Sequence, residues 1–269
     1  MKIIVLMENT SCHPECVAEH GLSIYIETPC HKALLDTGAS PAFLDNAERL
    51  GVDLSQIDTL ILSHGHYDHA GGIPAFTKLN PSARIYMQES AVCDYYHGDR
   101  YIGIDRQIAL LPQICMRHGD FQIDEELSVF SQVTGRRFFS QSNFSLKKRV
   151  NGTDIQDDFS HEQYLVITQA EKRILLSGCA HNGILNILDH YRRLYGSMPQ
   201  AVISGFHMMK KDAYTDEEIT VIEKTADELN RLNIVYYTGH CTGQAAFALM
   251  KPILKEKLVA LHGGMEITL

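Results

Sequence analysis

The stretch from Leu60 to Gly72, LILSHGHYDHAGG, constrains this chain more than any other part of its sequence. It opens with an apolar run, residues 60–62, that is typical of a short buried strand. Three histidines and an aspartate follow almost at once: His64, His66, Asp68 and His69. A turn needs no such concentration of imidazole and carboxylate groups, whereas a metal site does.

The spacing of these side chains indicates how they are used. His64 and His66 are two residues apart, so on an extended backbone both project to the same side and can reach one cation. Asp68 and His69 follow as the chain turns toward a helix, which sets them to hold a second cation. A histidine-rich surface loop is the alternative, but an array of this kind directly after a strand has few structural uses.

Composition narrows the class of protein. A formal net charge of -9 argues against a nucleic-acid partner, because phosphate binding depends on clusters of Lys and Arg. No apolar run approaches the roughly 20 residues needed to cross a bilayer, and residues 3–7 are too few for a secretory signal. The seven cysteines are odd in number and scattered, which suits a reducing compartment. We therefore expect a cytoplasmic protein that acts on a small molecule, without a membrane or nucleic-acid partner.

Hydrophobic periodicity predicts alternating strands and helices along the whole chain. Ser40 is expected to cap a helix that begins at Pro41 and ends near Leu50. The other predicted helices cover 72–79, 183–195 and 216–232, and the predicted strands cover 2–7, 22–28, 32–36, 60–62, 84–87, 127–133, 164–168, 173–177, 201–204 and 234–238. No linker divides the chain, so we expect one domain over residues 1–269.

Residues 89–126 form a less regular, tyrosine-rich segment between two parts of the chain that carry histidines. A segment of this length is compatible with a lid or a pocket wall, and equally with a pair of surface helices.

Further His and Cys residues stand next to predicted strands. His161 precedes strand 164–168, Cys179 and His181 follow strand 173–177, and His207 and His240 each follow a later strand. Because strand ends at one edge of stacked sheets converge in space, distant segments of this kind can share a metal.

The histidine array after its strand resembles the metal-binding signature of the metallo-beta-lactamase superfamily. The resemblance implies an α/β fold, a four-layer αββα sandwich, with the metal site at one edge between the two sheets. It also implies that Asp36, in Asp36-Thr37-Gly38, lies beneath the metal loop and orients it.

The superfamily pattern implies a ligand set for two cations. It assigns His64, His66 and His161 to the first cation, and Asp68, His69, Cys179 and His240 to the second. Cys179 stands where the superfamily most often has Asp, and a thiolate there is a sound zinc ligand. His181 is the rival to Cys179, and it faces the substrate if Cys179 is the ligand.

Two more histidines are expected near the substrate. His207 follows a strand at the same edge, which favours a hydrogen bond from its neutral ring to the substrate over a capping or core role. His20 precedes strand 22–28, where it is either a loop residue or a substrate-binding one.

One or two zinc ions are the expected cofactor, since imidazole, carboxylate and thiolate ligands suit zinc, although iron and manganese are compatible too. Two adjacent cations lower the pKa of a shared water to about 7. Asp68 is the expected catalytic residue, because it can orient that water and later receive a proton.

Several further motifs are similar to the branch grouped with dihydropterin-aminobenzene-phosphate synthase. They are Glu19-His20-Gly21-Leu22-Ser23, His161-Glu162-Gln163, Gly178-Cys179-Ala180-His181-Asn182-Gly183-Ile184, Gly205-Phe206-His207 and Gly239-His240-Cys241-Thr242-Gly243. The leading hypothesis is a metal-dependent hydrolase of a small ester, lactone, thioester or phosphodiester. A synthase-like pterin enzyme and a non-catalytic metal-containing module that binds a metabolite are the alternatives.

Overall fold

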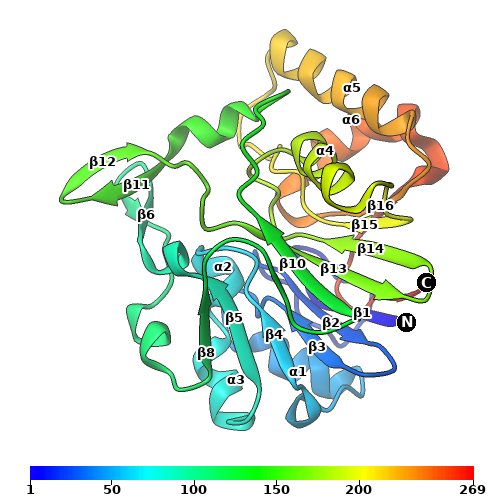
Figure 1. The fold of residues 1–269 in the computed structure, drawn as a ribbon. Coiled ribbons are helices and arrows are strands. Elements are labelled where there is room, and N and C mark those ends of the chain that lie inside the picture. The colour runs from blue at the N-terminus through cyan, green and yellow to red at the C-terminus, as the bar shows by residue number, and fades with distance from the viewer.

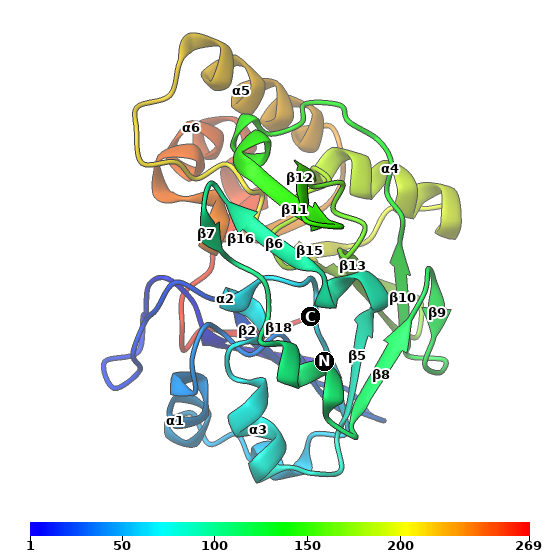
Figure 2. The ribbon, with the colours of Figure 1, turned by 90° about the vertical axis from the view of Figure 1, so that its left-hand side faces the viewer.

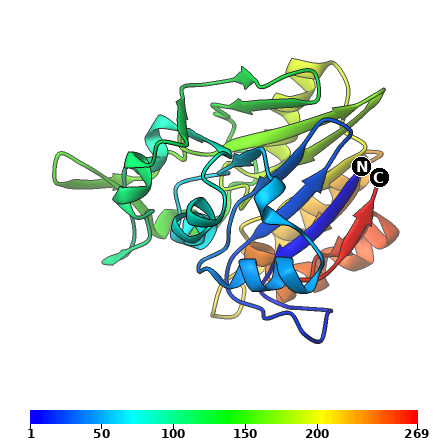
Figure 3. The ribbon, with the colours of Figure 1, turned by 90° about the horizontal axis from the view of Figure 1, so that it is seen from below.

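The computed structural model describes residues 1–269 and contains two seven-stranded sheets packed face to face (Figure 1). In the first sheet the strands lie in the order β18 (Glu266–Thr268), β1 (Lys2–Met7), β2 (Ser23–Glu27), β3 (Lys32–Leu35), β4 (Thr59–Ile61), β5 (Arg84–Gln88) and β8 (Ile114–Arg117). The two chain termini lie side by side, because β1 pairs with β18 (Figure 3).

The second sheet is built mainly from the C-terminal half of the chain. Its strands lie in the order β17 (Leu258–Ala260), β16 (Val235–Thr238), β15 (Ala201–Ile203), β14 (Lys172–Leu176), β13 (Gln163–Gln169), β10 (Leu127–Ser131) and β9 (Phe121–Gln122).

Helices cover the outer face of each sheet. The first sheet is covered by α1 (Ala42–Arg49) and α3 (Ile73–Leu79), with the short α2 (Tyr67–Ala70) at its edge, and the second by α4 (Ile184–Tyr195), α5 (Asp216–Asn230) and α6 (Gln244–Leu254) (Figure 1). The expected αββα sandwich is confirmed.

Three apolar clusters fill the three interfaces between these four layers. One joins the first sheet to α1 and α3 and includes Phe43 and Phe76, and another joins the second sheet to its helices and includes Tyr191 and Tyr236. The third fills the space between the sheets, where residues such as Ile61 are fully buried. Burying both faces of the central strands explains why they read as continuous apolar runs in the sequence.

Strand direction brings the functional side chains to one edge. β3, β4 and β5 run parallel in the first sheet, and β14, β15, β16 and β17 run parallel in the second. The chain segments that follow β4, β14, β15 and β16 carry the histidines and cysteines singled out above. Parallel strands end at the same edge, so these segments meet there.

A smaller four-stranded sheet stands beside the sandwich (Figure 2). It pairs β6 (Asp94–His97) and β7 (Arg100–Tyr101) with β11 (Leu146–Val150) and β12 (Thr153–Gln156). Residues 89–126 therefore contain strands and short 3-10 turns rather than a pair of surface helices.

Helix and strand bounds agree closely with those predicted. The N-cap of α1 is Pro41 rather than the expected Ser40, whose hydroxyl, one residue earlier, accepts a 3.1 Å hydrogen bond from the Ala42 backbone N–H. The 3-10 turns are η1 (Leu54–Gln56), η2 (Glu89–Val92), η3 (Arg106–Leu110), η4 (Gln141–Ser145), η5 (His240–Thr242) and η6 (Lys255–Lys257). None of the helices combines the length and the apolar character needed to cross a bilayer.

Candidate metal centre

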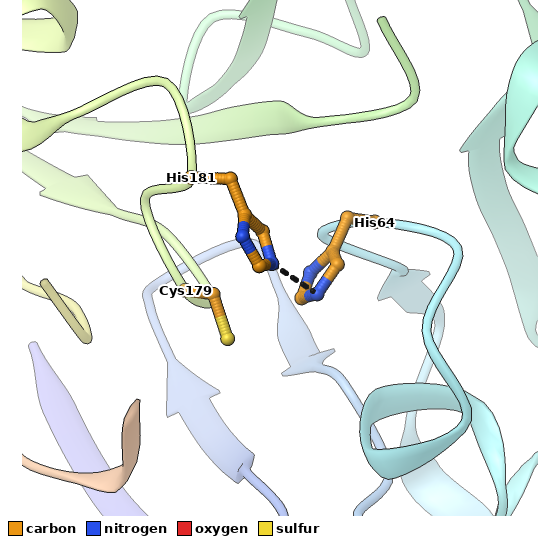
Figure 4. A group of neighbouring side chains, drawn as sticks. All are labelled: His64, Cys179 and His181. Atoms are coloured by element: carbon orange, nitrogen blue, oxygen red, sulfur yellow. Dashed lines mark hydrogen bonds between the residues drawn. The ribbon is translucent and has the colours of Figure 1, made fainter. Parts of the chain in front are cut away.

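His64 and His181, from the loops after β4 and β14, meet across the gap between the two sheets (Figure 4). Their Nε2 atoms are 3.3 Å apart, and potential ligand atoms of both rings lie within 4.8 Å of the Cys179 sulfur. Two nitrogens that each lie about 2.0 Å from one tetrahedral zinc are separated by roughly this distance.

The hydrogen bonds of the Nδ1 atoms of these two rings determine which ring nitrogen carries the proton. The Ser63 hydroxyl donates to Asp36 at 2.6 Å, so it accepts from His64 Nδ1 at 2.9 Å. Asn143 donates its amide N–H to the His181 carbonyl, which turns its Oδ1 toward His181 Nδ1 at 3.2 Å. Both Nδ1 atoms therefore carry the proton, and the two facing Nε2 atoms present lone pairs to each other.

A second pair of rings repeats this arrangement. His69 Nδ1 donates to the Asp36 carboxylate at 2.6 Å, and His240 Nδ1 donates to Asn9 Oδ1 at 2.9 Å. The Nε2 atoms of His69 and His240 are then both unprotonated and lie 3.2 Å apart. Two lone pairs at this distance repel each other unless a cation lies between them, which is the tautomer control typical of metal-binding histidines.

Asp68 and Cys179 complete the second group. The Asp68 carboxylate is 3.5 Å from His240 Nε2 and 3.9 Å from His69 Nε2, and the Cys179 sulfur is 3.3 Å from His69 Nε2. Two imidazoles, a carboxylate and a thiol around one point form a donor set that suits zinc.

His66 supports the same interpretation. Its Nε2 atom is buried and has no hydrogen-bond partner, although buried polar atoms are nearly always paired. The ring lies 4.6 Å from that of His64 and 4.9 Å from that of His181, measured between centroids. The residues present thus fit a metal ion beside His64, His66 and His181.

Burial keeps these imidazoles neutral, as ligands must be. It lowers the pKa of His66 to about 3 and the pKa values of His64 and His181 well below their ordinary range. Burial alone raises the pKa of Asp68, but the neighbouring His69 and a hydrogen bond from His20 lower it well below the usual range. Asp68 is therefore an anion at neutral pH.

His161 takes a different position from the one expected. Its Nδ1 accepts a 2.9 Å hydrogen bond from the Gly65 backbone N–H, and its Nε2 is 3.2 Å from Asp157. With one nitrogen accepting and the other donating, the ring as placed has no lone pair free for a cation. His161 still shares a possible metal-binding group with His66 and Asp157, whose ligand atoms all lie within 4.8 Å of one another. The structure thus places both His161 and His181 beside the His64–His66 pair, with His181 as the rival to His161 for the first cation.

His20 and His207 both lie close to the centre. The half-exposed His20 ring stacks on His240 with centroids 4.8 Å apart, and its Nε2 is 3.3 Å from the Asp68 carboxylate. The His207 ring lies 4.0 Å from that of His181, and its buried Nδ1 has no hydrogen-bond partner.

Two buried glutamates to which we had assigned no role hold the loops that carry His181 and His240. Glu162 accepts from the backbone N–H groups of His181 and Asn182 at 2.6 and 3.0 Å, and Glu8 accepts from the His240 N–H at 2.5 Å. What marks these two acidic residues as functional is that they are almost fully buried. Burial cannot be seen in a single sequence.

Four of the ten non-glycine residues with positive φ angles lie at this centre. Asp36, Ala180, His207 and His240 have positive φ angles of 61°, 55°, 47° and 47°. Such angles are costly for residues other than glycine and cluster at functional sites, where surrounding contacts hold them.

Comparison with known proteins agrees with this geometry. The sequence model of the metallo-beta-lactamase superfamily matches residues 17–125. The chain is 27% identical over 260 residues to an uncharacterized protein of Methanocaldococcus jannaschii, covering 93% of this chain and 94% of that one. It is also 27% identical over 279 residues to 7,8-dihydropterin-6-methyl-4-(beta-D-ribofuranosyl)-aminobenzene-5'-phosphate synthase of the same organism, covering 93% and 90%.

A solved structure described as a metal-dependent hydrolase of the beta-lactamase superfamily is similar over the whole chain. It matches with a TM-score of 0.85 and 28% identity, covering 100% of this chain and 99% of that one. The fold, the histidine array and these relatives agree: the chain is similar to the metallo-beta-lactamase superfamily in sequence over residues 17–125 and in fold over its whole length.

Proposed function

We propose that this chain is a metal-dependent hydrolase that binds two zinc ions between its sheets and acts on a small ester, lactone, thioester or phosphodiester. His64, His66 and His181 are the proposed ligands of the first ion, with Asp68, His69 and His240 around the second. Cys179 is near both groups and is the proposed shared ligand.

One observation carries this proposal. The Nε2 atoms of two histidine pairs face each other at 3.2 and 3.3 Å, while each Nδ1 is engaged by an oxygen acceptor. A cation between the two rings of each pair accounts for both contacts. Bound zinc would polarise a substrate oxygen and lower the pKa of a water molecule.

The protein's own groups then orient that water and handle its proton. Asp68 is an anion beside both histidine groups, and it is the proposed acceptor of a proton from the attacking water. His20 contacts the Asp68 carboxylate and keeps 45% of its side chain exposed, so it is the proposed contact with the substrate.

Residues 89–126 are proposed as a wall of the substrate site. The Tyr95 ring lies 4.0 Å from that of His161, and Ile102 accepts a 2.9 Å hydrogen bond from the Tyr67 backbone N–H. The segment thus packs against the loop that carries His64 and His66, where a change in its position alters access to the metals.

A synthase-like reaction on a pterin phosphate is the second candidate. The observation in its favour is the relative named as a dihydropterin-aminobenzene-phosphate synthase, which aligns with 93% of this chain. Both candidates use the same metal centre, so substrate turnover rather than metal content separates them.

The test is turnover on a panel of esters, lactones, thioesters, phosphodiesters and a dihydropterin phosphate with the zinc-loaded protein. We expect hydrolysis of at least one class of ester, abolished in His64→Ala and reduced at least 100-fold in Asp68→Asn. Glu171→Gln, an exposed change in the turn between β13 and β14, is the control. Binding of a metabolite at micromolar concentration without turnover of any substrate would instead indicate a non-catalytic module.

A further inference from the structure

A third group of metal-binding side chains adjoins the proposed two-zinc centre. Potential ligand atoms of Cys179, His207 and Cys241 all lie within 4.8 Å of one another. Cys241 and His207 are not needed by either proposed zinc ion, and Cys241 is 4% exposed. A buried cysteine is often only a small apolar side chain, so the surrounding structure has to distinguish packing from ligand binding.

The local backbone is shaped around the Cys241 sulfur. The His207 backbone N–H donates to it at 3.3 Å, and the Cys241 thiol donates to the Cys179 carbonyl oxygen at 3.4 Å. A Cβ atom at Gly205 would lie 2.4 Å from this sulfur, so only glycine leaves room for it. Two segments that follow β15 and β16 thus hold the sulfur beside Cys179.

His207 is held in the same place by a strained backbone. Its φ of 47° is unfavourable for a residue with a side chain. The Ser142 hydroxyl donates to its carbonyl at 3.0 Å, but its buried Nδ1 atom has no partner. A strained histidine with an unpaired nitrogen beside two thiols is better explained by a missing ligand than by packing.

We infer that Cys179, His207 and Cys241 form a separate binding position for a soft or borderline cation, such as Cd²⁺, Zn²⁺ or Cu⁺. Two thiolates and one imidazole match the ligand preference of these ions. The thiols release their protons on binding. Cys179 would be shared with the neighbouring zinc positions, and the fourth ligand would be a water or substrate group.

The first test is titration of the protein with Cd²⁺, followed by metal analysis and by near-ultraviolet absorption of the cadmium–thiolate bonds. Cys241→Ser is expected to lose one equivalent of bound Cd²⁺ and about half of the absorption that depends on Cys179 and Cys241. Cys115→Ser, which changes a partly buried cysteine on β8, is the matched control and is expected to behave as the wild type. Equal Cd²⁺ content and absorption in wild type and Cys241→Ser would overturn the inference.

Crystals of the wild-type protein soaked in Cd²⁺ give a second test that does not require the variant to fold. We expect an anomalous peak between the sulfur atoms of Cys179 and Cys241 and a ring nitrogen of His207. Peaks confined to the His64 and His69 groups, or a disulfide between Cys179 and Cys241, would overturn the inference. Neither readout requires turnover, so a failure of the proposed hydrolase activity would leave this result unaffected.

Discussion

The Nδ1 atom of His161 accepts a 2.9 Å hydrogen bond from the backbone N–H of Gly65, the residue between His64 and His66. The same ring faces Asp157 with its other nitrogen. His161 thus shapes the loop that carries two proposed ligands, while His181 approaches His64 from the other sheet. The two histidines are predicted to differ sharply in their effect on metal content.

We predict that His181→Ala lowers bound zinc from two equivalents to one, because it removes a direct ligand. His161→Asn keeps an acceptor for the Gly65 N–H and should retain both equivalents, with affinity reduced at most about 10-fold. Metal analysis after dialysis against a weak chelator measures both. Loss of one zinc in His161→Asn together with full content in His181→Ala would restore the ligand set that the superfamily pattern implied.

Asp36 provides a prediction about tautomer control. Its carboxylate accepts from His69 Nδ1 at 2.6 Å and from the Ser63 backbone N–H at 2.7 Å. Asp36→Asn can present an N–H to His69, which favours the tautomer with the proton on Nε2, where the cation binds. We expect the zinc affinity of the second position to fall by about 10- to 100-fold.

Competition with a chromophoric chelator measures this affinity. Asp45→Asn, an exposed change on α1, is the control and should leave the affinity as in the wild type. Equal affinity in all three proteins would show that Asp36 does not set the state of His69.

The positions of the histidines at strand ends were sufficient to predict which chain segments meet at this edge of the sandwich. The two-residue spacing predicted that His64 and His66 project to the same side. The rule that parallel strands end at one edge predicted that Cys179 and His240 lie near them, and in the structure Cys179 shares a group with His64 and both share a group with His69. These inferences succeeded because they rest on strand direction, which apolar runs reveal well.

Other features depend on contacts that no local pattern encodes. His161 and His181 both adjoin strands, and only the hydrogen bond to Gly65 distinguishes their roles. β6 and β11 each form a hairpin with the next strand, but they pair with each other across about 50 residues, and no local pattern indicates that pairing. We did not predict α6, because Gly243 precedes it and Pro252 lies inside it, and both residues usually mark the ends of helices.

Glu162 is predicted to stabilise the loop after β14. It accepts hydrogen bonds from two backbone N–H groups and from the Tyr164 hydroxyl at 2.5 Å, and burial raises its pKa. Glu162→Gln turns an N–H group toward these donors, so the free energy of unfolding should fall by about 2 kcal/mol. Thermal unfolding should then shift down by roughly 6 °C. Since His181 is on this loop, zinc content should fall with stability, whereas Glu171→Gln should change neither.

His31 gives a prediction about pH that is independent of the metals. Its ring bridges Asp58, at 2.7 Å from Nδ1, and Asp124, which faces Nε2. It thus joins the turn between β2 and β3 to two other loops. Burial lowers the pKa of His31, but the hydrogen bonds and charges of the two aspartates raise it more, so the net shift is upward. A raised pKa means that the protonated ring favours the folded state.

The stabilisation is complete below the unfolded-state pKa of about 6.5 and disappears as the pH rises through the folded-state pKa. His31→Gln should therefore lower the free energy of unfolding by about 1 kcal/mol at pH 6 and by clearly less at pH 9. Urea unfolding of the chelator-treated protein measures this, because metal binding carries its own pH dependence. His118→Gln, which changes a ring that is 80% exposed, is the control. An equal loss at both pH values would mean that His31 contributes by packing alone, since only a charged contribution disappears on deprotonation.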